Sequence, residues 1–102
     1  MFEVDGKQYE FKFNLGRIKL IEAATKTSLM GEYATSNGIF SLQTMDVIFQ
    51  LATKEAGSDT FIGQANGSKL FEKALEERGY ATLTAEIQTA LTGDMPFLFQ
   101  AN

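Results

Sequence analysis

The chain has 102 residues, no cysteine or histidine, and nine Lys and Arg against thirteen Asp and Glu, a net charge of −4. This length suits one domain, over residues 1–102, with a core that needs no disulfides. The composition excludes thiolate and imidazole metal sites and removes the commonest general base, and the acidic balance argues against nucleic-acid binding.

Residues 1–14, "MFEVDGKQYEFKFN", are predicted to form a β-hairpin. Asp5-Gly6 is typical of a two-residue type I′ turn, which needs positive φ at both positions. The expected pairs are Phe2 with Tyr9, Glu3 with Gln8, and Val4 with Lys7. One face then carries Phe2, Val4, Lys7, Tyr9, Phe11 and Phe13, so Lys7 alone interrupts an apolar face. Such a face must be covered, most simply by helices.

The helical body is expected over residues 15–93. Asn14 is the predicted N-cap of a helix over 15–26, and Ser28 of a short helical turn that ends at Tyr33. Ser41 is the expected cap of a helix that stops at Gly57, followed by a polar loop that Phe61 and Ile62 pin to the body. Two further helices are predicted, one between Ser68 and Gly79, the other between Thr82 and Gly93. Pro96 prevents a continuation, which leaves an apolar tail over residues 94–102.

These elements predict an α+β fold that is mainly helical, with the N-terminal β-hairpin packed on a small bundle of about four helices. No motif in it points to chemistry. The carboxylates Glu72, Glu76 and Glu77 fit the solvated side of one helix, and the glycine-bearing loop lacks the phosphate-loop pattern. We therefore predict no enzyme, no catalytic residue, no cofactor and no metal.

No apolar run approaches the roughly 20 residues that span a bilayer, and no signal-peptide pattern is visible. We therefore expect no membrane partner and an intracellular, soluble protein. The sequence also predicts no nucleic-acid partner, because its basic residues are scattered along the chain.

Aromatic residues are the informative excess, with nine Phe and three Tyr. The predicted core aromatics are Phe2, Tyr9, Phe11, Phe13, Phe49 and Phe71. The candidate partner-binding residues, at element edges or in the tail, are Phe40, Phe61, Phe97, Leu98 and Phe99. For the tail, packing on its own domain and binding a partner both stay open. In the free protein we expect it to lie on its own domain or on a neighbouring copy.

The stretch "FEVDGKQYEFKFNLGRIKLIE", with "MDVIFQLATKE", "KLFEKALEERGY", "ATLTAEIQTAL" and the closing "FLF", resembles the tail assembly chaperones of long-tailed, siphovirus-type phages and prophages of Gram-positive bacteria. The resemblance covers nearly the whole chain in order and length. Its motifs consist of hydrophobic spacing with a few fixed letters, such as the pattern G-K-x-Y-x-h-K-F, where h is apolar.

This resemblance implies a non-enzymatic protein of the host bacterial cytoplasm that is absent from the mature virion. It implies that the chain binds and solubilises the tape measure protein and promotes tail tube polymerisation around it. A frameshift-extended form would recruit the tail tube protein, and the chain would self-associate. Two other classes remain open: a small structural virion component, such as a head–tail connector or tube-associated protein, and a small bacterial adaptor or regulator.

Overall fold

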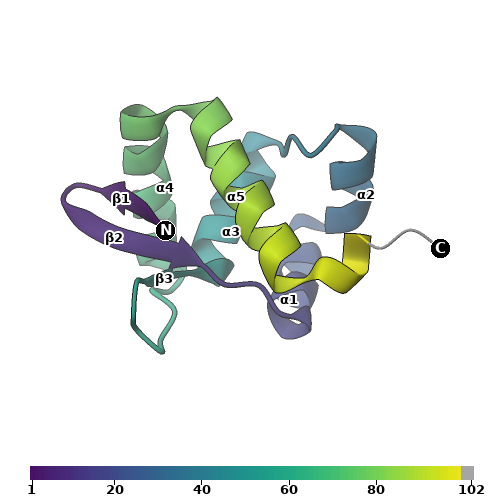
Figure 1. Cartoon of the computed structure of the whole chain (residues 1–102), viewed down its shortest axis with the longest axis horizontal. Coiled ribbons are helices and arrows are strands. Elements are labelled where there is room, and N and C mark those ends of the chain that lie inside the picture. Colours follow the sequence, from purple (N-terminus) through teal and green to yellow (C-terminus); the bar gives the residue numbers. More distant parts are fainter. Residues whose placement is uncertain (100–102) are drawn as a thin grey trace.

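The computed structural model of the chain describes residues 1–99. In chain order its elements are β1 (Phe2–Val4), β2 (Lys7–Phe11), α1 (Leu15–Thr25), α2 (Leu29–Thr35), α3 (Leu42–Ala52), β3 (Thr53–Glu55), α4 (Gln64–Arg78), α5 (Tyr80–Asp94) and the 3₁₀ turn η1 (Pro96–Phe99). The molecule measures 42 × 26 × 23 Å, with the sheet at one end of the long axis and α2 at the other (Figure 1). The α+β, mainly helical fold is confirmed.

The hairpin forms as its turn chemistry predicts. Asp5 and Gly6 have φ values of 53° and 81°, and Phe2, Glu3 and Val4 pair with Tyr9, Gln8 and Lys7. Four of its apolar side chains are buried: Phe2, Val4, Phe11 and Phe13. Local turn residues and strict alternation were therefore sufficient to fix the register.

A third strand was missed. The helix predicted to stop at Gly57 ends at Ala52, and β3 pairs antiparallel with the free edge of β2. Thr53, a β-branched and fully buried residue, takes an extended conformation with φ −110° and ψ 140°. The hydrogen bonds gained along β2 outweigh the helical preference of the following residues, so the predicted helix boundary was wrong.

Three helix caps follow the prediction. The side chains of Asn14, Ser28 and Ser41 accept hydrogen bonds from backbone N–H groups at the starts of α1, α2 and α3. The predicted caps at Ser68 and Thr82 were wrong. Glycines precede both helices instead, Gly63 before α4 and Gly79 before α5, each with positive φ. Residues 1–99 thus contain five α-helices where about four were expected.

The first turn of α4 is helical because it must approach α3 closely. Gly67 lies so near this helix that a Cβ would be 2.4 Å from the carbonyl oxygen of Phe49 and 2.5 Å from the Cα of Gln50. Only a residue without a side chain allows this backbone contact. The sequence pattern showed Gly67 as part of a polar loop, whereas the packing makes it a helix–helix contact.

The core between the sheet, α3 and α4 is built on aromatic rings. The Phe49 centroid lies 5.8 Å from Phe2, 5.1 Å from Phe11 and 5.3 Å from Phe71, in edge-on or tilted arrangements. Five of the six predicted core aromatics are buried, and Tyr9 is half-buried. Helix α5 crosses in front of α3 and carries the chain away from the sheet towards η1 (Figure 1).

Candidate functional site

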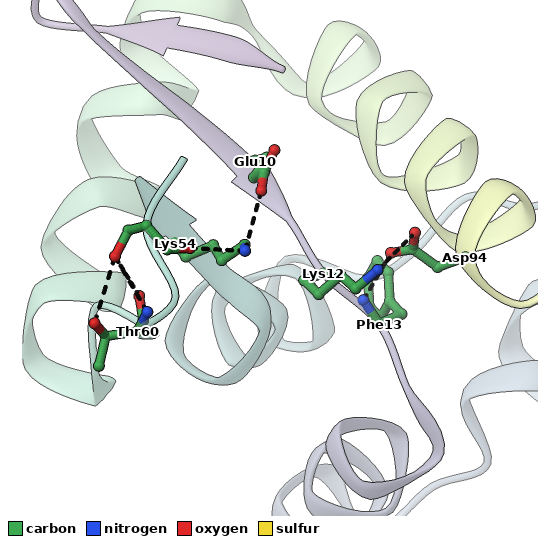
Figure 2. A network of polar contacts seen from close by, with 7 residues as sticks. Glu10, Lys12, Phe13, Lys54, Thr60 and Asp94 are labelled. Carbon is green, nitrogen blue, oxygen red and sulfur yellow. Dashed lines mark hydrogen bonds and ion pairs between the residues drawn. The ribbon is translucent and has the colours of Figure 1, made fainter. Parts of the chain in front are cut away.

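A network of polar contacts lies along β2 and β3 (Figure 2). The ammonium of Lys54 lies 3.3 Å from the Glu10 carboxylate and donates to the Ser58 carbonyl at 2.7 Å. The backbone N–H of Thr60 donates to the Ser58 hydroxyl at 3.1 Å. These contacts hold the loop after β3 against the sheet, so we assign them a structural role.

The same view shows how the end of the sheet is joined to the end of α5. The Asp94 carboxylate accepts a hydrogen bond from the backbone N–H of Phe13 at 2.8 Å and lies 3.6 Å from the Lys12 ammonium (Figure 2). Phe13 is buried, so this carboxylate satisfies an amide that would otherwise lack a partner. This joint is also structural.

Within residues 1–99, no three acidic side chains come together as a metal site would require. None of the helices in this part of the chain has the length and apolar character needed to cross a membrane.

The structure places Phe40 differently from the prediction. Its side chain is fully buried, and its ring centroid lies 5.9 Å from that of Tyr33. The Tyr80 hydroxyl donates a hydrogen bond to the carbonyl oxygen of Phe40, and this bond holds the α2–α3 loop against α5. Because this loop is anchored on α5, Phe40 faces the core and is not part of an exposed partner surface.

Phe61 is half-buried near the sheet. The Arg17 guanidinium lies 3.7 Å above its ring centroid, and its backbone forms a bridge with Lys54. The next residue, Ile62, donates its N–H to the Thr53 carbonyl at 3.0 Å. The prediction that these two residues pin the loop to the body is confirmed, and Phe61 offers a partner only part of its ring.

The tail folds back on its own domain. In η1, Phe97 is 52% exposed, whereas Leu98 and Phe99 are half-buried and pack against the core. The Phe99 ring meets Tyr33 edge-on at 5.0 Å. The expectation that the tail lies on its own domain is thus confirmed for residues 96–99. Residues 100–102 of the predicted tail lie outside the described residues.

Tyr33 brings two of the five predicted residues together, since its ring touches both Phe40 and Phe99. Phe61 belongs to a separate place, beside β3. The predicted set is therefore not one surface. Its member with the largest exposed apolar side chain is Phe97.

An apolar hollow that the sequence reasoning missed lies between the α2–α3 loop and α5. It has a volume of about 230 Å³ and is lined by Ile39, Tyr80, Ala81, Thr84, Ala85 and Gln88. The Gln88 amide donates to the Gly38 carbonyl at 2.7 Å and fixes the loop at its edge. Ile39 is 50% exposed. The sequence signal for this hollow was the adjacent apolar pair Ile39-Phe40. Two neighbouring side chains in a loop rarely both face inward, so one of the pair could be expected at the surface.

Comparisons with protein families, with curated proteins and with solved structures find no match for this chain. The function must therefore be inferred from its residues and their arrangement.

Proposed function

We propose that this chain is a non-enzymatic phage tail assembly chaperone that binds the tape measure protein and keeps it soluble. The observation that carries the proposal is the apolar hollow around Ile39 and Tyr80. Its lining joins two elements, and an apolar depression with an exposed rim can receive an apolar side chain of a partner helix. The family resemblance supplies the identity of the client.

The hollow suits a helical client. An amphipathic helix presents apolar side chains one turn apart, and such helices bind by inserting them into apolar depressions. The small side chains of Ala81 and Ala85, one turn apart on α5, leave room for this insertion between Ile39 and Tyr80. Phe97 adds a second exposed apolar group at the other end of α5. The net charge of −4 favours a dissolved complex over aggregation.

The proposal extends to the rest of the assembly step. The chain acts in the host bacterial cytoplasm in several self-associating copies, and tube subunits polymerise around the client. A frameshift-extended form recruits the tail tube protein. The chaperone then leaves, so it is absent from the virion. The resemblance alone supports these points.

The test is co-expression with the tape measure protein encoded in the same genome, followed by co-purification and measurement of soluble client. Ile39→Ser is the test variant and Leu20→Ser, on α1, is its matched control, because both side chains are 50% exposed. We expect Ile39→Ser to lose most of the bound and soluble client, while Leu20→Ser behaves as the unmodified chain. Equal behaviour of the two variants, or a genome without a tape measure gene, contradicts the proposal.

Purified particles distinguish the chaperone from a small structural virion component. Quantitative mass spectrometry should find the tube protein and the tape measure protein but not this chain. A stoichiometric amount of it in intact tails would identify a head–tail connector or tube-associated protein instead.

A further inference from the structure

The proposed function leaves a second depression without a role. It has a volume of about 460 Å³ and lies between the hairpin and α4. Its floor is apolar, made by Val4 and Leu70, which are buried, and by Tyr9 and Ile62, which are half-buried. We call it the lysine cleft, after the three lysines at its rim: Lys7, Lys69 and Lys73.

The lining of the cleft carries these three lysines and two carboxylates, Asp5 and Glu55, which sum to +1 in a chain of −4. Outside the lining, the Glu77 carboxylate accepts a hydrogen bond from the Asp5 backbone N–H at 3.2 Å. Lys73 lies 3.0 Å from Asp5, and Lys7 lies 3.9 Å from Glu55. Within residues 1–99, Lys69 has no ion pair.

Packing alone does not explain the positions of Lys7 and Lys69, whereas Lys73 is bonded to Asp5. Lys7 occupies a position on the hairpin face that alternation assigns to an apolar residue. Lys69 and Lys73 are one turn apart on α4, and like charges at that spacing destabilise a helix. The hydrogen bond from Lys73 to Asp5 raises the pKa of its ammonium, a group that is charged at neutral pH in any case.

We propose that the lysine cleft binds a protein segment that carries carboxylates beside apolar side chains. Apolar side chains of the segment cover Val4, Tyr9 and Leu70, and its carboxylates approach Lys69 and its neighbours. A small anion is a poorer fit, because the Lys7 and Lys73 side chains are 66% and 60% exposed and exposed pairs contribute little each. A segment adds apolar burial to several such pairs. The inference does not depend on the tape measure protein.

The test uses the whole chain, labelled with ¹⁵N, and a short synthetic peptide that alternates Glu with Leu and Phe. Two matched peptides replace every Glu by Gln, or every Leu and Phe by Ala. We expect saturable amide shifts at the residues of the cleft with the first peptide. Affinity should fall as salt is added. Each matched peptide should bind at least about tenfold more weakly, since it loses several charge pairs or the apolar contact.

Protein variants locate the site. Lys69→Gln should weaken binding of the first peptide about two- to fivefold, as expected for one exposed charge pair. Lys19→Gln, an exposed lysine of α1 outside the cleft, is the control and should have no effect. Both variants should unfold at the denaturant concentration of the unmodified chain.

Four results would overturn the proposal. These are no saturable shift at about 1 mM peptide, the weak limit of specific binding, shifts confined to the Ile39 hollow, equal affinities of the Lys69→Gln and Lys19→Gln variants, and saturation of the same shifts by inorganic phosphate alone. The last would mean a simple anion site. None of these four results bears on the loss of client binding that is expected for the Ile39→Ser variant, so the two proposals can fail separately.

Discussion

The two ends of the molecule use aromatic residues in different ways. At the sheet end, the Phe49 ring contacts the rings of Phe2, Phe11 and Phe71, and all four side chains are buried. At the α2 end, within residues 1–99, the Tyr33 ring contacts the rings of Phe40 and Phe99, and the nearby Ile39 and Phe97 are half-exposed. The sheet end therefore supplies stability, while the α2 end and α5 retain apolar surface that can be changed at little cost to the fold.

The same substitution made at each end should show this difference most clearly. Phe49→Ala removes the ring at the centre of the cluster and should lower the free energy of unfolding by about 3–5 kcal/mol. Phe97→Ala removes a half-exposed ring and should lower it by less than about 1 kcal/mol. Urea denaturation followed by circular dichroism measures both. Similar losses would show that η1 is as much a part of the core as the sheet.

Glycine replacements test the close contact behind the sheet. Gly67→Ala places a methyl group against the α3 backbone, which cannot rotate away, and should destabilise by about 2–3 kcal/mol despite the better helix propensity of Ala. Gly93→Ala in α5 meets no atom within 4 Å and should stabilise by up to about 1 kcal/mol. Opposite signs in thermal or urea unfolding are the expected outcome, and a neutral Gly67→Ala would contradict the packing of α4 on α3.

The parts of the fold predicted from sequence are those set by local chemistry. The Asp5-Gly6 turn, the alternation around it and the caps at Asn14, Ser28 and Ser41 each act within a few residues. The third strand and the start of α4 depend instead on distant partners. Thr53 is extended because β2 offers an edge, and Gly67 is helical because α3 lies against it.

The candidate surfaces were less predictable for the same reason. Ile39 and Phe40 are adjacent and both apolar, and only the anchoring of their loop by Tyr80 and Gln88 decides which one turns inward. Lys7 was recognised as an exception on the hairpin face, but its neighbours Lys69 and Lys73 come from a helix more than sixty residues away. No local pattern connects them.

The joint between the two regions should show an intermediate effect. Asp94→Ala leaves the buried N–H of Phe13 without its acceptor and should cost about 1–2 kcal/mol. Asp94→Asn retains a side-chain oxygen and should cost less. Lys12→Gln, which removes only the exposed ion pair, should cost under about 1 kcal/mol. Urea unfolding ranks the three, and faster hydrogen exchange at Phe13 in Asp94→Ala would locate the change. Equal losses in Asp94→Ala and Lys12→Gln would mean that the hydrogen bond contributes nothing.

The smallest effect concerns Phe61, the predicted partner residue that lies beside the sheet. If its ring serves the fold, Arg17→Gln and Phe61→Leu should each destabilise, and together they should cost less than the sum, because either one abolishes the same cation–π contact. The expected coupling is about 0.5–1 kcal/mol, measured in a double-mutant cycle by urea unfolding.

Arg17 also donates to the Leu51 carbonyl at 3.1 Å, and the cycle subtracts that contribution because it does not involve Phe61. Arg17→Lys keeps a charge but not the planar group and should retain only part of the coupling. Additive losses would mean that the cation–π contact does not stabilise the fold. The Phe61 ring would then remain a candidate partner-binding group.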